Sequence, residues 1–199
     1  MKAKELKVLD PLELFRKWYL EAKKLESNNP NACCLATTDI RGFPSARMIL
    51  VKKLDERGFI FYTNLNSKKA ENLSRNTKVA LCFYWKSLSK QVRVEGSIMD
   101  LPSKEADDYF ASRDRDSQIG AWISKQSKPL SGGISELDKK YKLEKAKLGT
   151  RKIVRPSFWS GKIVIPEKIE FWSSRDYRLH ERILYTTFNK GWKKEYLYP

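Results

Sequence analysis

Hydrophobic and polar residues alternate with two different periods along this chain, and the change of period separates helical from extended segments. Residues 10–13 (DPLE) have the features of a helix start, an N-cap aspartate followed by proline and then glutamate. Apolar residues then recur at helical spacing as far as Ala22, and the pattern breaks at 27–30 (SNNP). The sequence therefore predicts an N-terminal helical segment, within residues 1–30, that packs one face on a core.

From Ala32 to Trp85 the pattern has the two-residue period of strands. The runs ACCLATT, FPSARMILVKKL, FIFYTN and KVALCFYW are separated by turns at 39–42 and 55–58, and a short helix is expected over 66–75. Consecutive strands joined in this way predict an antiparallel meander. Five later runs predict further strands: QVRVEGSIMDL, SFWSGKIVI, KIEFW, RLHERILYTTF and WKKEYLY. Helices are expected over 103–113, 121–127 and 136–147.

Short strands with interspersed helices predict the fold class α+β, mainly β, built on a closed antiparallel barrel with flanking helices. There is no internal repeat and no linker rich in Pro, Gly or Ser, so residues 1–199 are expected to form a single domain. The polar, lysine-rich stretch 128–149 contains a Gly-Gly pair and is expected to be mobile.

Residues 170–182 (EFWSSRDYRLHER) contain the only histidine of the chain. If the segment is extended, Arg178, His180 and Arg182 share one face at steps of roughly 6.5–7 Å. Two guanidiniums beside an imidazole would bind a small anion, because like charges on one strand face repel unless something neutralises them. A solvated edge strand, protected from aggregation by its charges, explains the same pattern equally well.

Composition narrows the class of protein. A net charge of +16 raises the possibility of a nucleic-acid partner, but the lysines are dispersed, which favours solvated surfaces. Cys33, Cys34 and Cys82 lie in apolar runs without metal-ligand spacing, which predicts reduced thiols, no metal site and a cytoplasmic location. No run reaches the ~18 apolar residues that a membrane span needs, so no membrane association is expected.

Common phosphate-binding glycine motifs are absent, so side chains must hold any phosphate. Arg47 and Lys52 flank an apolar run, and being five residues apart they face opposite sides of a regular strand unless a bulge intervenes. Lys68 and Lys69 follow Ser67 at a predicted helix start, where amide donors favour an anion. A further hydroxyl and guanidinium set lies at 109–117, and several anion-binding sets suggest two phosphorylated ligands.

Taken in order, the segments RMILVK, FYTN, SKKAENL, QVRVEG, YFASRDRDSQIGAW, SKQS, FWSG, IEFW and RLHER resemble the pyridoxamine 5′-phosphate oxidase family. The resemblance covers the chain from about Ala32 to its C-terminus. It implies a split-barrel FMN-binding fold and a homodimer whose active sites lie at the interface. The implied reaction oxidises pyridoxamine 5′-phosphate or pyridoxine 5′-phosphate to pyridoxal 5′-phosphate, with O2 as acceptor and H2O2 as product.

The resemblance also implies residue roles. Catalytic roles fall on Arg178 and His180, and the substrate contacts fall on these two with Lys52, Tyr109, Arg113 and Ser117. The FMN contacts fall on Arg47, Met48, Ile49, Leu50, Val51, Lys52, Tyr62, Thr63, Lys68, Lys69, Gln91, Gln126, Ser127, Trp172 and Arg182.

Four positions depart from the family pattern. Lys68 replaces an arginine, Asp114 a proline, Ser160 a glycine and Tyr196 a terminal arginine. Two alternatives to the oxidase stay open at this point. One is another split-barrel enzyme of the flavin reductase type, and the other is a barrel that binds single-stranded nucleic acid.

Overall fold

The barrel that organises the molecule is closed by six antiparallel strands. The structure, a computed structural model, describes residues 10–199. The strand order is β3-β2-β1-β4-β5-β6, and a further pairing of β3 with β6 closes the ring. The strands are β1 (Ala32–Thr38), β2 (Pro44–Asp55), β3 (Gly58–Asn64), β4 (Lys78–Trp85), β5 (Lys90–Asp100) and β6 (Trp159–Ser173).

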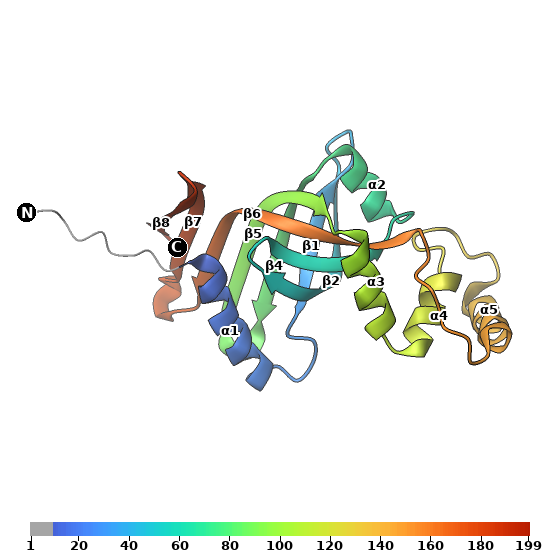
Figure 1. Cartoon of the computed structure of the whole chain (residues 1–199). Helices are drawn as coiled ribbons and strands as arrows, with labels where there is room; N and C mark the ends of the chain where they lie inside the picture. The colour runs from blue at the N-terminus through green and yellow to red at the C-terminus, as the bar shows by residue number, and fades with distance from the viewer. Residues whose placement is uncertain (1–9) are drawn as a thin grey trace, which may run out of the picture.

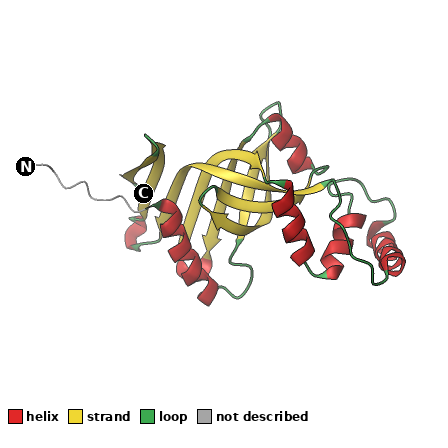
Figure 2. Cartoon of the chain, in the orientation of Figure 1, coloured by secondary structure: helices red, strands yellow, loops and turns green. Residues whose placement is uncertain are grey.

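Two more strands extend the sheet beyond the barrel. β7 (Glu181–Phe188) pairs with the last part of β6, and β8 (Gly191–Leu197) pairs only with β7. This hairpin projects at one end of the molecule, whereas α3 (Ser103–Ser112), α4 (Arg115–Ile123) and α5 (Gly133–Leu148) gather at the other (Figure 1). The predicted class, a mainly β split barrel with flanking helices, is confirmed (Figure 2).

Helix α1 (Pro11–Leu25) begins as predicted, with the Asp10 carboxylate accepting a hydrogen bond from the Leu12 amide. Its buried face places Phe15 in the barrel core, where its ring lies 4.9 Å from those of both Phe59 and Phe83. Truncating such a side chain to alanine costs about 3–5 kcal/mol of stability. The helix therefore closes this part of the barrel, and residues 1–9 of the expected N-terminal segment lie outside the described residues.

The β2–β3 turn is tight because it packs directly on β6. Gly58 has φ +137°, and a Cβ at this position would overlap the carbonyl oxygen of Val164. A side chain is excluded on both grounds. The turn thereby fixes the register of β3, which carries site residues further along.

Four predicted elements need correction. The meander is wrong, because β4 pairs with β1 rather than β3, which leaves β3 free to close the barrel on β6. SFWSGKIVI and KIEFW are one strand, β6, because an extra β6 residue, Glu167, lies between the pairs Gly96–Pro166 and Glu95–Lys168, and the ladder with β5 continues on both sides of it. The helix expected at 121–127 lies earlier, at Arg115–Ile123, where Asp114 caps it.

The fourth correction concerns residues 170–182, which are not one extended strand. β6 ends at Ser173 and β7 begins at Glu181, with a short helical turn at Asp176–Arg178 between them. Tyr177 and Arg178 have left-handed φ of 55° and 62°, which no strand allows. The expected row of Arg178, His180 and Arg182 on one strand face therefore does not exist.

Helix α2 (Lys68–Arg75) is capped by Ser67, and α5 covers the helix predicted at 136–147. The mobility expected for 128–149 remains a prediction. Within residues 10–199, no helix combines the length and the apolar character that crossing a bilayer requires.

Candidate functional site

Two adjoining hollows lie where β2 and β3 meet the helical end of the molecule. One has a volume of about 260 Å³ and the other about 310 Å³. Both are lined by Tyr62, Thr63, Arg113, Gln126 and Trp159, so they form one continuous cleft. We call this the phosphate cleft, because its charged groups are cations.

Strand β2 contributes Lys52 to the cleft, at a bulge. The register with β3 shifts between Val51 and Lys53, which rotates Lys52 relative to regular alternation. Lys52 lines the phosphate cleft together with Met48, Ile49 and Leu50, whereas the Val51 side chain is buried in the barrel core. A bulge thus intervenes between Arg47 and Lys52, but of these two only Lys52 lines the cleft.

Lys69 is a buried cation whose partners are all neutral. Its residue surface is 9% exposed, and its Nζ donates to Gln126 Oε1 at 2.9 Å, Thr63 Oγ1 at 3.1 Å and Ser67 Oγ at 3.4 Å. Burial, and secondarily the charge of Arg47, lowers the pKa of this ammonium. An anion entering the cleft would supply the countercharge that these neutral oxygens do not.

Arg47 lies nearby on β2 and is likewise held by neutral groups. Its Nη1 donates to Thr37 Oγ1 at 2.7 Å and to the Leu35 carbonyl at 3.2 Å. Asn72 of α2 donates to the same Thr37 hydroxyl at 3.0 Å, while its own buried Oδ1 has no partner. Burial lowers the pKa of Arg47. Arg47 and Lys69 together form the first cationic group.

Aromatic rings build the other wall of the cleft. Tyr62 of β3 and Tyr109 of α3 stack with centroids 3.9 Å apart, and Trp159 stacks on Tyr62 at 5.1 Å. Arg113 lies over the Trp159 ring at 5.0 Å. Burial raises the pKa of Tyr62 to about 12 and that of Tyr109 above its usual value, so both phenols stay protonated hydrogen-bond donors.

Arg113 is the second uncompensated cation of the cleft. Its Nη1 is buried and finds no hydrogen-bond partner among residues 10–199, which is costly for a guanidinium. Burial lowers its pKa, and the nearby Asp114 carboxylate only partly opposes this. Arg113 lines both hollows, so a cation with an unused donor lies at the wall of the cleft.

Asp114 explains how Ser117 reaches the same place. Its carboxylate accepts a hydrogen bond from the Ser117 amide at 2.8 Å, capping α4 at its first turn. Its φ of −58° is also the value that proline adopts, so either residue fits the family's turn. Ser117 lines the cleft beside Arg113. The structure thus brings Tyr109, Arg113 and Ser117 together as the sequence predicts.

A second group of predicted residues lies across three neighbouring strands. Gln91 of β5 is opposite Trp172 of β6, which is opposite Arg182 of β7. Arg182 Nε donates to Glu170 Oε1 at 2.7 Å, and Glu170 also accepts from Arg93 at 3.2 Å. This buried carboxylate, which the sequence gave no reason to select, fixes the direction of the Arg182 guanidinium.

Arg178 and His180 extend this second group. The His180 ring lies 4.7 Å from that of Trp172, and its Nδ1 accepts a hydrogen bond from the Arg175 amide at 3.3 Å. Nε2 is therefore the nitrogen that can exchange a proton with a ligand. Arg178 is exposed in the turn before β7.

The two groups do not meet within one chain. Trp159 of the phosphate cleft begins β6 and Trp172 of the second group is near its end, 13 residues later. At about 3.3 Å per residue this separates them by roughly 40 Å along the strand. The two ends of the orange strand in Figure 1 show this separation. Within one chain, the predicted residues therefore form two separate groups.

Several predicted residues lie apart from these groups. Lys68 is exposed and pairs with Glu71 at 3.6 Å, and Ser127 occupies a left-handed turn at φ 69°. Ser160 pairs with Thr63 across β3 and β6, and exposed Tyr196 lies under Lys194. Trp159, which lines both hollows, was not among the predicted site residues, although the FWSG segment contains it. Within residues 10–199, no cluster of His, Cys, Asp and Glu could hold a metal ion.

Comparisons with known proteins show the family of the chain. Residues 21–140 match the family model described as pyridoxamine 5′-phosphate oxidase, and residues 159–199 match the model described as the pyridoxine 5′-phosphate oxidase C-terminal dimerisation region. A pyridoxine/pyridoxamine 5′-phosphate oxidase of Rhodospirillum rubrum is 49% identical over 195 residues, covering 96% of each chain.

Solved structures of similar fold include PhzG from Burkholderia lata 383, in complex with tetrahydrophenazine-1-carboxylic acid. It is 28% identical with a TM-score of 0.89, and the match covers 96% of this chain and 93% of that one. A pyridoxamine 5′-phosphate oxidase-related, FMN-binding protein of Nostoc punctiforme shares the fold, with a TM-score of 0.77 at 15% identity over 96% and 99% of the two chains.

Proposed function

The chain belongs to the pyridoxamine 5′-phosphate oxidase family, and we propose that it oxidises pyridoxamine or pyridoxine 5′-phosphate to pyridoxal 5′-phosphate, using FMN and O2 and releasing H2O2. The observation that carries the proposal is the pair of cationic groups in the phosphate cleft. Among residues 10–199, Lys69 is buried with only neutral hydrogen-bond partners, and the buried Nη1 of Arg113 has no hydrogen-bond partner. Two phosphorylated molecules, cofactor and substrate, would neutralise them.

The first group fits the phosphate of FMN. Arg47 and Lys69 supply cationic donors, and Thr63 and Gln126 already contact Lys69. The backbone of β2 from Met48 onward would lie along the flavin. When bound, FMN supplies the two-electron redox chemistry, and its reoxidation by O2 yields hydrogen peroxide.

The second group fits the phosphate of the vitamin. Arg113 offers its orphaned Nη1, Tyr109 and Ser117 offer hydroxyl donors, and Lys52 offers an ammonium from the opposite wall. These donors bind a group that does not react, so they fix the position of the pyridine ring relative to the flavin.

The remaining roles require a second chain. We assign Gln91, Trp172 and Arg182 to FMN, and Arg178 and His180 to the substrate, in the phosphate cleft of a partner subunit. Arg178 would stabilise charge at the reacting oxygen or amine, and His180 Nε2 would hold or move its proton. The match of residues 159–199 to a dimerisation region supports this arrangement.

The first experiment is a visible spectrum and a turnover assay. FMN-loaded protein should be yellow and should convert pyridoxine 5′-phosphate to an aldehyde with stoichiometric peroxide. A protein that stays colourless with added FMN would exclude the oxidase, and steep salt-dependent binding to single-stranded DNA would then favour the nucleic-acid alternative. A coloured protein that reduces flavin with a nicotinamide donor, but oxidises no B6 phosphate, would favour a reductase.

The substrate assignment has its own test. Arg113→Ala should raise KM for pyridoxine 5′-phosphate by about 10- to 100-fold with a smaller effect on kcat, because it removes a charge-assisted contact present in ground and transition states alike. Oxidation of tetrahydrophenazine-1-carboxylic acid, which carries no phosphate, is a useful comparison. Preference for that compound over the B6 phosphates would contradict the proposal.

Mixed dimers test the shared site. At substrate concentrations well below KM, Arg113→Ala and Arg178→Ala should each disable one half of a shared site. A mixed dimer would then contain one doubly altered site and one unaltered site. Random mixing after co-refolding should recover about a quarter of the parental activity, because half of the dimers are mixed and each has one intact site. No recovery would show that each site is built from a single chain.

A further inference from the structure

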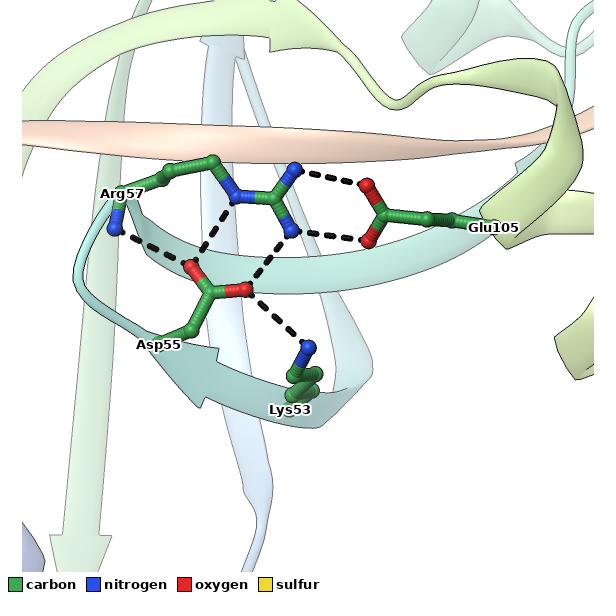
Figure 3. Close-up of polar contacts among 4 residues, drawn as sticks. All are labelled: Lys53, Asp55, Arg57 and Glu105. Atoms are coloured by element: carbon green, nitrogen blue, oxygen red, sulfur yellow. Dashed lines mark hydrogen bonds and ion pairs between the residues drawn. The ribbon is translucent and has the colours of Figure 1, made fainter.

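A dense ionic cluster lies at the β2–β3 turn, outside the cleft (Figure 3). Arg57 forms a bidentate pair with Glu105, with Nη1–Oε1 at 2.7 Å and Nη2–Oε2 at 2.8 Å. Its other edge contacts Asp55, with Nε–Oδ1 at 3.2 Å and Nη2–Oδ2 at 2.7 Å. Lys53 Nζ lies 3.2 Å from the same carboxylate.

The geometry makes this cluster rigid. All three guanidinium nitrogens of Arg57 are used, in one plane, by two carboxylates that come from different elements. Asp55 is buried, and hydrogen bonding from Arg57 holds its pKa at about 2, while the same guanidinium lowers the pKa of Glu105. Both carboxylates therefore remain ionised at neutral pH, and the arrangement is fixed in direction as well as distance.

Glu105 lies in the first turn of α3, the helix that delivers two phosphate-cleft residues. Glu105, Tyr109 and Arg113 are spaced four residues apart, so they follow one side of the helix and its end. Tyr109 stacks at 3.9 Å on Tyr62 of β3, and Arg57 precedes β3. The salt bridge therefore joins the two elements whose side chains form the aromatic wall.

The two ends of α3 are held by different apolar contacts: Phe110, in its last turn, packs on the Trp159 ring at 5.2 Å, whereas its first turns have only a small contact. Ala106 is the buried residue of its first turns, and it packs in a cluster with Ile60, Leu101 and Ile163. An alanine has little side-chain volume to interlock with its neighbours, so Ala106 restrains the first turns only weakly. The ionic contact of Glu105 adds a directional restraint at this end of the helix.

We propose that Arg57 and Glu105 are positioning residues for the substrate phosphate, holding α3 so that Tyr109 and Arg113 face the cleft. This inference rests on the proposed function, which assigns Tyr109 and Arg113 to that phosphate. The FMN phosphate group at Arg47 and Lys69 is carried by β2 and α2, so it does not depend on this restraint. Loss of the pair should therefore weaken substrate binding and leave FMN binding unchanged.

The experiment uses the FMN-loaded protein and the variants Glu105→Ala and Glu105→Gln. Both leave Arg57 paired with Asp55, so no buried carboxylate is orphaned. The matched control is Asp108→Ala, which removes an exposed pair with Lys104, at 2.8 Å, from the same helix. The binding probe is 4-deoxypyridoxine 5′-phosphate, a phosphate ester that lacks the reacting oxygen. Its dissociation constant is measured by quenching of tryptophan fluorescence, and KM, kcat and the FMN dissociation constant are measured in parallel.

Glu105→Ala should raise KM and the dissociation constant of the ester about 3- to 10-fold, with kcat and FMN affinity within about twofold of the parent, since one bidentate pair outside the site is lost. Glu105→Gln, which keeps one hydrogen bond, should fall between, and Asp108→Ala should match the parent. Equal ester affinity in Glu105→Ala and the control, or equal losses of ester and FMN affinity, would overturn the positioning role. A parent that binds the ester but oxidises no B6 phosphate would instead overturn the proposed function, because ester binding is read without turnover.

Discussion

Lys69→Met gives the most discriminating test of the phosphate cleft, because it should separate cofactor binding from stability. The ammonium is buried, and all the partners that the described residues give it are neutral oxygens at 2.9–3.4 Å. A hydrogen bond from a charged group is worth about 1.5–3 kcal/mol. Losing that bond to the FMN phosphate should raise the FMN dissociation constant about 10- to 150-fold, at about 1.4 kcal/mol per factor of ten.

The effect on the FMN-free protein should have the opposite sign. Burial lowers the pKa of Lys69 in the folded state, so at neutral pH the unfolded chain holds this proton more strongly than the folded chain does. The charged side chain therefore reduces stability at neutral pH, and the reduction fades as pH rises through the lowered pKa toward the ordinary lysine value. Methionine has a similar length and no charge, so the FMN-free variant should melt at the same temperature as the parent or a few degrees higher.

Two measurements check this prediction: titration of FMN fluorescence for the dissociation constant, and thermal melts without FMN. Arg75→Gln is the matched control, because it removes one charge from an exposed position of the same helix α2. The reasoning would be refuted by an FMN dissociation constant within threefold of the parent. It would equally be refuted if the FMN-free Lys69→Met protein melted well below the Arg75→Gln protein, since Lys69 would then be a structural residue.

Two further predictions concern residues outside the cleft. Asp55→Asn should lower stability by about 2 kcal/mol at neutral pH and progressively less as pH falls from about 4 toward 2, because the ionised carboxylate stabilises the fold only above its folded pKa of about 2. Urea unfolding at pH 3 and 7 measures this loss of stability, and an equal loss at both pH values would contradict the prediction. Asp114→Ala should lower the stability of the fold by about 1 kcal/mol through loss of the α4 cap, whereas Asp114→Pro should lower it less because the native φ of −58° suits proline. Thermal melts that rank the two variants in the reverse order would count against the capping role.

Local signals in the sequence located most of the elements correctly. The helix start at residues 10–13 depends on capping and proline chemistry within one turn, and Ser67 caps α2 for the same reason. The closeness of Tyr109, Arg113 and Ser117 in space followed from helical spacing and a nearby turn, so it was also predictable. Each of these features is determined by residues a few positions apart.

The errors arose where distant strands decide the outcome. Residues 170–182 alternate like a strand, yet β6 ends at Ser173. The neighbouring strand β5 begins at Lys90, which is opposite Ser173, and beyond this point the chain must turn back to form β7. The pairing of β4 with β1 is likewise a choice among barrel partners that periodicity does not distinguish. For this reason Arg178, His180 and Arg182 do not share one strand face as expected.

By itself the sequence determined the periodicities, the helix caps, the excess of cations and the ordered segments that mark the family. Only the tertiary structure decided which cations are left without a countercharge. Burial and partner geometry leave Lys69 and the Arg113 Nη1 uncompensated, while Arg57 and Arg182 are paired with Glu105 and Glu170. The same residue types thus divide into binding groups and structural ion pairs, because an ion's free energy depends on its surroundings in space and not on its neighbours in sequence.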